Sequence, residues 1–496
     1  MIILVDFLFY ELFSTTFLEY LLVMSIQEID IANYTQDLHV DKEDKEMYGE
    51  ILSPFSLIED MFSLLPPAVF QQKNKRWLDT GAGSGFFSMI LYHKLYDGLR
   101  EKIPLHEERH KHIIENMLFM VELREKNVEK LKQMFGETAN IIYCDFLSTD
   151  YHSSLIKSFD YVIGNPPFHF NGVKKVPTNT TKSKKTDGIT PWFSFIKRSI
   201  GLLRTNGLLL YIVPAIWMKP DKARAYHYLT SYHLEKIKCY TNTETNKIFS
   251  GEAQTPTSAF LLKKKHYPTL LPQSIELFDK DREKFTTYIL YPENPIPLFG
   301  ASIIQKLQPF IGEAKNHLQV VKTNMPKKTA ILSVNSSTTH PYPNIHTCKL
   351  DYIVPTLKIV YSDQPLAFYG DTKLCLAHKM YGFPFLDTDG KYGISNRDNY
   401  VIYNKTVADL KQIAAFLRTK TALYIYEAAR YRMKYLEKYA FEFIPDISQL
   451  EDFPSEPNDE NIAQYFDFDS IDRENIAKLH KKNYQFSFID THTNNI

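Results

Sequence analysis

The sequence lacks the cysteine patterns of disulfide-bonded and zinc-binding proteins. Its four cysteines, Cys144, Cys239, Cys348 and Cys375, lie far apart and include no CxxC pair. The spacing therefore favours neither a disulfide framework nor a zinc knuckle. Reduced thiols are typical of the cytoplasm, so we expect a cytoplasmic protein, or one acting in the host cytoplasm if its source is viral.

Net charge and a long uncharged hydrophobic segment are also missing. The chain has 58 Lys and Arg residues against 58 Asp and Glu residues, which excludes a uniformly basic nucleic-acid coat but not a local basic cleft. The apolar residues 1–23 carry Asp6, Glu11 and Glu19 and no Lys or Arg, unlike a signal peptide or a membrane span. We therefore expect no membrane partner, and we expect residues 1–40 to be a peripheral extension.

The chain does contain an alternation of short apolar runs, turns and amphipathic segments, from residue 48 to about residue 265. This alternation predicts an α/β domain with a doubly wound, Rossmann-like sheet over residues 41–292, with an insertion at about 94–117. The expected strands are 76–79, 118–122, 140–144, 161–163, 208–213, 234–240 and 258–263. Residues 293–450 are expected to form a mixed α+β domain, and the acidic residues 451–496 a helical tail.

A glycine-rich turn follows the first expected strand, in the segment Asp79-Thr80-Gly81-Ala82-Gly83-Ser84-Gly85. Glycines let the backbone approach a ligand closely, and the helix that follows offers unpaired N–H groups at its N-terminus. The spacing is GxGxG and differs from the dinucleotide pattern GxGxxG. The turn is therefore either a nucleotide-type site or a tight structural turn.

Two acids lie where a cofactor with a ribose and an adenine would need them. Glu122 ends the second expected strand and is our candidate for the ribose hydroxyls, in preference to Glu101, which no strand precedes. Asp145 and Phe146 follow the third strand and are candidates for the adenine amino group and ring face. The alternatives are a solvated carboxylate at a helix start for Glu122 and a capping Asp beside a core Phe for the other pair.

The fourth expected strand ends in Asn165-Pro166-Pro167-Phe168. Prolines cannot continue a central ladder, so the chain leaves the sheet here on a rigid turn. The Asn165 side-chain oxygen and the Pro166 carbonyl are then paired acceptors for an exocyclic NH2 group, and Phe168 can stack on a base. The alternative is an Asn-Pro turn that merely ends the strand.

With these motifs the chain resembles the N6-adenine DNA methyltransferases of the gamma motif order, a TaqI-like group that includes the methylase part of single-chain restriction-modification enzymes. LDTGAGSG, MVE, YCDF and NPPF resemble its glycine, ribose, adenine and catalytic motifs. The resemblance implies a class I methyltransferase domain that uses S-adenosyl-L-methionine, followed by a target recognition domain that binds double-stranded DNA. It also implies that Pro54 and Phe55 border the methionine end of the cofactor and that Phe249 approaches the target base.

Basic and aromatic residues in the second region are candidates for DNA contacts. Residues 424–439 are expected to form one basic helix whose Arg430 and Arg432 bind phosphates, or simply present a solvated face. A glycine-turned segment carries four further candidates for base edges. These are Lys391, Asn396, Arg397 and Asn399.

Other functions remain open at this stage. The same NPPF turn also serves enzymes that methylate RNA adenine, a protein glutamine amide or cytosine N4, and a non-catalytic DNA-binding protein is a further alternative. No nuclease constellation is evident, so a separate cognate restriction endonuclease is a candidate partner. His106-Glu107-Glu108-Arg109-His110 matches the zinc-protease pattern HExxH, but its surroundings are charged all round, so we expect a surface helix and no metal.

Overall fold

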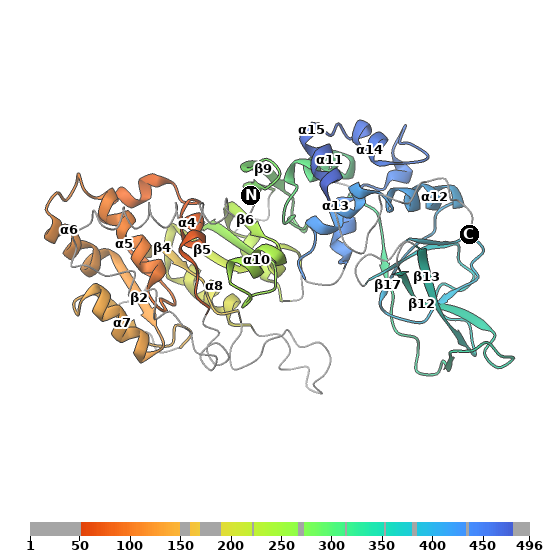
Figure 1. Cartoon of the computed structure of the whole chain (residues 1–496), viewed down its shortest axis with the longest axis horizontal. Helices are drawn as coiled ribbons and strands as arrows, with labels where there is room; N and C mark the ends of the chain where they lie inside the picture. The colour runs from red at the N-terminus through yellow and green to blue at the C-terminus, as the bar shows by residue number, and fades with distance from the viewer. Residues whose placement is uncertain are drawn as a thin grey trace, which may run out of the picture.

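The computed structural model describes residues 51–148, 159–168, 190–220, 223–265, 272–312, 315–351, 354–378, 384–432 and 436–479. The expected extension at residues 1–40 lies outside these ranges. The molecule is elongated, with the first half of the chain at one end and the sheets of the second half at the other (Figure 1). Four helices lie along one side, towards the second half: α11 (Ala301–Ile311), α13 (Lys420–Ala428), α14 (Asp459–Tyr465) and α15 (Ser470–Lys478).

A nine-stranded sheet forms the centre of the first half, in the order β3-β2-β1-β4-β5-β7-β6-β8-β9. Its strands are β1 Trp77–Asp79, β2 Leu118–Glu122, β3 Asn140–Tyr143, β4 Phe159–Gly164, β5 Leu203–Pro214, β6 His233–Tyr240, β7 Thr257–Lys263, β8 Gln273–Asp279 and β9 Lys284–Leu290. Strands β1 to β5 are parallel, and β7 runs antiparallel between β5 and β6. All seven strands expected from the sequence are present, which confirms the Rossmann-like fold.

Helices cover both faces of this sheet because its strands are apolar on both sides. The helices of this half are α4 Phe55–Phe62, α5 Phe86–Gly98, α6 His106–His112, α7 Glu125–Phe135, α8 Pro191–Leu202, α9 Ala225–Thr230 and α10 Asn242–Ile248. Along β5, Leu208 and Leu210 pack in the core under α4, α5 and α7, whereas Leu209 and Tyr211 pack in the core with α8 and α9. This alternation makes the sheet doubly wound.

The expected insertion contains helix α6 and a π-helical turn, Ile113–Met117, between α5 and β2. Its anchor is Arg109, which is 1% exposed, lies over the Tyr96 ring at 4.0 Å and donates to the Ile103 carbonyl at 2.9 Å. Of the two HExxH histidines, His110 bonds the Tyr92 hydroxyl at 2.8 Å and His106 bonds the Tyr96 hydroxyl. The segment is thus packed onto α5 through aromatic and cationic contacts.

The second half combines helices with two four-stranded sheets, in the orders β10-β17-β14-β15 and β11-β13-β12-β16. Its strands are β10 Val321–Lys322, β11 Leu332–Ser333, β12 Tyr342–Asp351, β13 Val354–Ser362, β14 Lys373–Ala377, β15 Phe385–Asp387, β16 Gly393–Ile394 and β17 Asn399–Tyr403. Its helices are α11 Ala301–Ile311, α12 Val407–Phe416, α13 Lys420–Ala428, α14 Asp459–Tyr465 and α15 Ser470–Lys478. This mixture confirms the expected α+β class.

The basic helix expected over residues 424–439 is wrong, because α13 ends at Ala428. The aromatic residues of this segment are needed in the core. Tyr431 is fully buried and donates to the Ile296 carbonyl at 2.7 Å, and Arg430 pairs with Glu427 at 3.1 Å. The last two helices also belong to the large core cluster, through residues such as Ile462 and Ile476.

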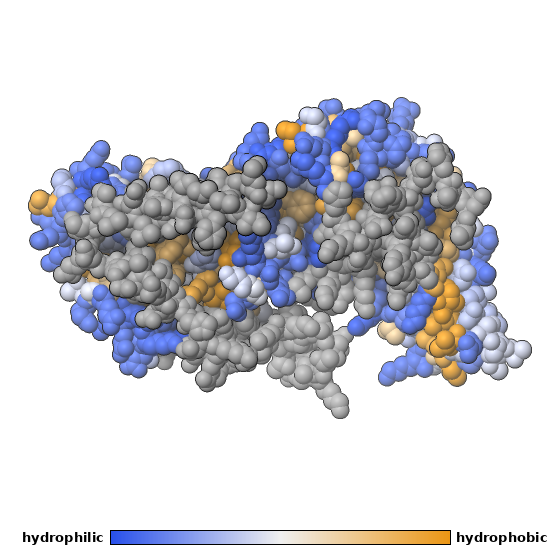
Figure 2. All heavy atoms as spheres, in the orientation of Figure 1, coloured by the Kyte–Doolittle hydropathy of each residue, from blue (hydrophilic) through white to orange (hydrophobic). Residues whose placement is uncertain are grey.

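All four cysteines are free. Within the described ranges, no helix is both long and apolar enough to cross a membrane, and no group of three or more metal-binding side chains occurs. Figure 2 shows hydrophobic residues on one flank of the second half, in the region of β12 and β13.

Candidate active site

A pocket opens at the carboxyl ends of β1, β2, β3 and β4, where the parallel strands meet loops on one edge of the sheet. Ligands of doubly wound folds bind at this edge. Nine of the thirteen predicted site residues line the pocket: Gly81, Gly83, Glu122, Asp145, Phe146, Asn165, Pro166, Pro167 and Phe168. The other four, Pro54, Phe55, Asp79 and Gly85, lie behind the lining.

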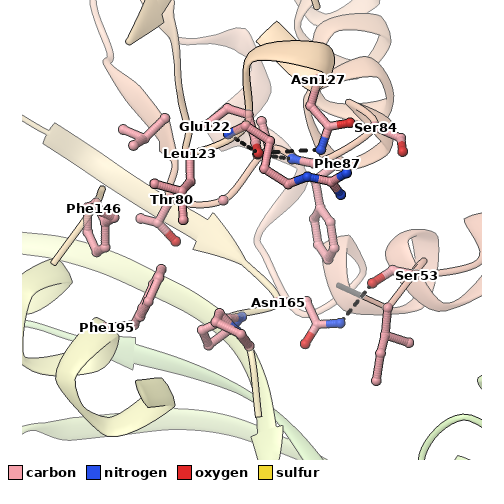
Figure 3. Close-up of a pocket in the computed structure, with 18 of the residues that line it drawn as sticks. Ser53, Thr80, Ser84, Phe87, Glu122, Leu123, Asn127, Phe146, Asn165 and Phe195 are labelled. Atoms are coloured by element: carbon pink, nitrogen blue, oxygen red, sulfur yellow. Dashed lines mark hydrogen bonds between the residues drawn. The ribbon is translucent and has the colours of Figure 1, made fainter. Parts of the chain in front are cut away.

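Glu122 connects the end of β2 to the glycine turn (Figure 3). One carboxylate oxygen accepts the Gly83 N–H at 2.7 Å, and the other accepts the Arg124 N–H at 3.0 Å. The Asn127 amide, which is 2% exposed on α7, donates to this second oxygen at 3.4 Å. The carboxylate is therefore held at a fixed place in the pocket wall, and Glu101 is not among the lining residues.

Asp79 lies beneath the turn rather than in the pocket wall. It is fully buried and accepts the Ser88 hydroxyl at 2.8 Å and the Gly81 N–H at 3.4 Å. Burial raises the pKa of Asp79 to about 7, against these two hydrogen bonds. Its function in the fold is to shape the turn from below.

Gly85 is a packing glycine at the start of α5. Its φ is +86°, and a Cβ there would lie 2.9 Å from Leu131 Cδ2 on α7. Gly81, in contrast, has no atom within 4 Å of such a Cβ, so the space above it is open. The turn thus combines one glycine that lets two helices approach with another that leaves the pocket clear.

Pro54 and Phe55 directly follow the lining residue Ser53 but do not line the pocket themselves. Pro54 precedes α4, and its carbonyl accepts the first N–H bonds of that helix. The Phe55 ring packs on Phe86 with centroids 4.7 Å apart. Their neighbour Ser53 lines the pocket in their place.

The far wall of the pocket is aromatic. Phe146, after β3, is buried and its ring centre lies 5.0 Å from that of Phe195 on α8. Asp145 is exposed, and its carboxylate accepts the Leu147 N–H at 2.8 Å. Leu123, next to Glu122, is 39% exposed and also lines the pocket. A partly apolar slot with a carboxylate at its edge suits an adenine ring.

The Asn165 turn faces this slot from β4. The Asn165 amide nitrogen donates to the Ser53 hydroxyl at 3.0 Å, and the amide oxygen lies on the side away from Ser53 (Figure 3). That oxygen is buried and accepts no hydrogen bond from the residues that the structure describes. A buried acceptor without a donor is costly, so its place in a pocket points to a ligand that supplies an N–H.

A chain of buried hydroxyls supports the floor between the two motifs. The Tyr211 hydroxyl bonds Thr80 of the glycine turn and, at 2.7 Å, Ser199 of α8. A Cβ on Gly164, which precedes Asn165, would lie 3.1 Å from the Thr80 hydroxyl oxygen. These contacts limit how closely the glycine turn and the Asn165 turn can approach each other.

Sequence reasoning missed several residues of the pocket, among them Ser53, Leu123, Asn127 and Phe195. Leu123 adjoins a predicted site residue, and adjacency was an available signal. Asn127 lies in the first turn of α7, which follows Glu122, and Ser53 precedes Pro54. Phe195 carries no local signal, because only the packing of α8 on the sheet brings it to Phe146. Phe249, which the resemblance suggested, does line the pocket.

Residues 60–249 match the family described as Eco57I restriction-modification methylase. This segment is therefore similar to the methylase domains of that family. The match includes the glycine turn, Glu122 and the Asn165 turn, and it covers less than half of the chain. A comparison with curated protein sequences gives no match.

Solved structures with similar chains include methyltransferases. A protein from Listeria monocytogenes described as a class I S-adenosylmethionine-dependent methyltransferase has 17% identity and a TM-score of 0.35 over 50% of this chain and 70% of that chain. The M protein of the type I restriction enzyme EcoKI has 17% identity and a TM-score of 0.36 over 47% and 51%. The type IIG restriction endonuclease BpuSI has 12% identity and a TM-score of 0.41 over 88% and 62%. This chain therefore spans about half of the M protein and under two thirds of BpuSI.

The residues present fit S-adenosylmethionine, the cofactor of class I methyltransferases. The open face of Gly81 leaves room for a ligand, and the fixed Glu122 carboxylate stands beside it. The unpaired Asn165 oxygen faces the same pocket. One ligand with hydroxyl groups and a second with an amino group would satisfy these groups together.

The second half differs in part from the expected base-reading set. Asn399 is fully buried and its amide donates to the His346 carbonyl at 3.1 Å, so the interpretation that it meets a base edge is wrong. Asn396 is half-buried and bonds the His346 ring at 3.2 Å. Lys391 and Arg397 are exposed, as direct contacts with DNA require.

Exposed cations gather near the junction of the two halves. Partial burial lowers the pKa of Lys322, whereas the carboxylates of Asp398 and Glu437 raise it and the charges of Arg397 and Arg432 lower it. Arg432 Nε lies 3.7 Å from Glu437, which also pairs with the buried Lys219 after β5 at 3.2 Å. Arg432 is therefore linked through Glu437 to Lys219, which follows the central strand β5.

Proposed function

We propose that the protein is a site-specific DNA methyltransferase that transfers the methyl group of S-adenosylmethionine to the N6 amino group of an adenine. The observation that carries the proposal is the buried Asn165 amide oxygen, which accepts no hydrogen bond within the described part of the chain. It sits on a turn made rigid by Pro166 and Pro167, beside the glycine turn. An exocyclic amino group is a donor that fits it.

The chain's own groups act by positioning and electrostatics. The Asn165 oxygen and the Pro166 carbonyl accept the two N–H bonds of the amino group, which draws its nitrogen towards a tetrahedral shape and frees the lone pair. S-adenosylmethionine, when bound, supplies a methyl group activated by its positive sulfur. The nitrogen becomes cationic as it takes the methyl group and then loses a proton, so no strong general base is needed.

The cofactor side of the pocket would be held by three groups. Glu122 accepts hydrogen bonds from the ribose hydroxyls, as a carboxylate at the end of the second strand does in doubly wound folds. Asp145 accepts from the adenine amino group, and Leu123 and Phe146 enclose the ring. Pro54 and Phe55 act at the methionine end through the position of Ser53, which lines the pocket.

The target base must leave the double helix to reach Asn165, because base pairing and stacking hide its amino group inside the duplex. Phe168 lines the pocket next to Asn165 and offers an aromatic face on which the extruded base can stack. Phe249, which is 4% exposed, closes the same pocket from the segment after α10.

DNA is the favoured substrate for two reasons. The match of residues 60–249 is to restriction-modification methylases, and the second half carries the exposed cations Lys322, Arg397 and Arg432 near the sheet. Such cations neutralise phosphates and contact base edges. A separate cognate restriction endonuclease is the proposed functional partner. Adenine in RNA and a protein glutamine amide are the alternative acceptors, because the same turn accepts any NH2 group.

The test is expression of the chain in cells without adenine methylation, followed by single-molecule sequencing of plasmid DNA. We expect N6-methyladenine within one sequence context, and none with Asn165→Ala. Asn74→Ala, which removes an exposed amide of the same half, is the matched control and should methylate normally. Methylation of cytosine N4, of RNA or of a glutamine amide, with unmodified adenine in DNA, would overturn the adenine assignment.

A further inference from the structure

Ser53 makes a contact that the methyl-transfer mechanism above leaves unused. Its hydroxyl oxygen accepts the amide N–H of Asn165 at 3.0 Å, across the pocket from the end of β4. Ser53 is 7% exposed, so this bond is shielded from water. It leaves the amide nitrogen bonded and the amide oxygen free in the pocket.

We propose that Ser53 is a positioning residue that holds the Asn165 amide with its oxygen towards the target amino group. The proposal rests on the proposed function, since it concerns the orientation of the group that accepts the target. An asparagine can present either its oxygen or its NH2 group by rotating its amide. An amide that presents NH2 meets the target NH2 as donor against donor and cannot bind it.

The serine hydroxyl supports the productive orientation when the target is present. A hydroxyl can accept from the amide nitrogen or donate to the amide oxygen, so it can bond the amide in both orientations. Only the first leaves an acceptor for the target amino group. Binding of the target therefore selects it, and Ser53 keeps the amide nitrogen hydrogen-bonded while the oxygen is in use.

Ser53 is itself held in place by a rigid neighbour. Pro54 follows it and directly precedes α4, whose Leu57 and Ile58 are buried in the core. Asp60 of this helix accepts the Tyr240 hydroxyl of β6 at 2.6 Å. The hydroxyl of Ser53 is thus fixed relative to the sheet that carries Asn165.

The first experiment compares wild-type protein, Ser53→Ala and Ser53→Thr in incorporation of tritiated methyl groups into duplex DNA. We expect kcat to fall about tenfold in Ser53→Ala, since loss of one partner leaves a shielded amide N–H unpaired. Threonine keeps the hydroxyl and should restore at least half of kcat. Calorimetry with sinefungin, a cofactor analogue, should give similar dissociation constants for all three. Weaker sinefungin binding with unchanged kcat at saturating cofactor would overturn the proposal.

A double-mutant cycle isolates the orientation effect from a general one. In Asn165→Asp both side-chain oxygens are acceptors, so the orientation no longer matters. Adding Ser53→Ala to that variant should change the rate of methyl transfer by less than twofold. The same limit should hold for capture of the target base, which the fluorescence of a flanking 2-aminopurine reports. An equal loss in both backgrounds would overturn the proposal, because Ser53 would then act independently of the amide.

The test remains distinct from that of the proposed function. Absence of methylation of DNA by the wild-type protein counts against the proposed function alone. If the protein methylates RNA or a glutamine amide instead, the same Ser53 variants would be assayed on that substrate. The expected ratios of kcat between the variants and the wild type are the same there. Tryptophan fluorescence of each variant during denaturation checks that the domain is folded, since Trp77, Trp192 and Trp217 are all buried in it.

Discussion

The buried carboxyl of Asp79 should make the stability of the methyltransferase domain depend on pH. Its pKa is about 7 in the folded protein, compared with 3.8 for an unperturbed carboxyl, because burial disfavours the ion. Below pH 3.8 both folded and unfolded chains keep the proton. As the pH rises towards 7, only the unfolded chain loses it, so the folded state loses stability up to the folded pKa.

The magnitude follows from the difference of about 3 in pKa. Each pKa unit corresponds to about 1.4 kcal/mol, so Asp79 should lower the free energy of unfolding by about 4 kcal/mol from pH 4 to above pH 7. About 2 kcal/mol of this should fall between pH 5 and 7. The reference is Asp79→Asn, which is isosteric and does not titrate.

The assay is urea denaturation of the cofactor-free protein at several pH values, followed by tryptophan fluorescence. All three tryptophans of the chain lie in the first half and are buried, so the signal reports this domain. Up to pH 7, the free energy of unfolding of the wild type should fall relative to that of Asp79→Asn. Above pH 7 the difference between the two proteins should stay constant. Asp145→Asn, which removes an exposed carboxyl of the same site, is the control. A constant difference between wild type and Asp79→Asn from pH 5 to 8 would refute the reasoning.

Three further predictions concern cofactor binding, packing and DNA recognition. Glu122→Ala should weaken S-adenosylmethionine binding about 10- to 100-fold in calorimetry, since it removes charge-assisted hydrogen bonds, and an unchanged dissociation constant would return attention to Glu101. Gly85→Ala should lower the free energy of unfolding by about 1–3 kcal/mol because of its positive φ and the close Leu131 contact, whereas Gly81→Ala should leave it unchanged. Arg397→Ala should cost about 1–3 kcal/mol in binding to a duplex that carries the recognised sequence, and little in binding to a scrambled duplex. An equal loss on both duplexes would mean that Arg397 contacts a phosphate instead of a base.

Local sequence patterns predicted the sheet of the first half well. Strands of a doubly wound sheet are buried on both faces, so they appear as short apolar runs between turns, and all seven expected runs form strands. The pocket-lining residues at strand ends followed from the same logic, because loops at the carboxyl ends of parallel strands meet at one edge. Asp79 and Gly85 shared the glycine motif with lining residues, but only packing decided that they lie beneath the surface.

The second half was harder to predict because its aromatic and basic residues serve the core as well as the surface. Residues 424–439 have a helical pattern, yet α13 ends at Ala428 so that Tyr431 can be buried against Ile296. Asn399 follows a turn and has the chemistry of a base-reading residue, but the strand that contains it places its side chain inside. Burial outweighs local propensity at such positions.

The sequence by itself determined the class of fold, the glycine turn, the acid at the end of the second strand and the Asn-Pro turn, since each depends on neighbours within a few residues. Tertiary structure alone decided which groups meet. Ser53 and Asn165 are far apart in the chain, as are Phe146 and Phe195, and each pair forms a contact in the pocket. The physical reason is that hydrogen bonds and ring contacts depend on distances that the packing of helices on the sheet sets.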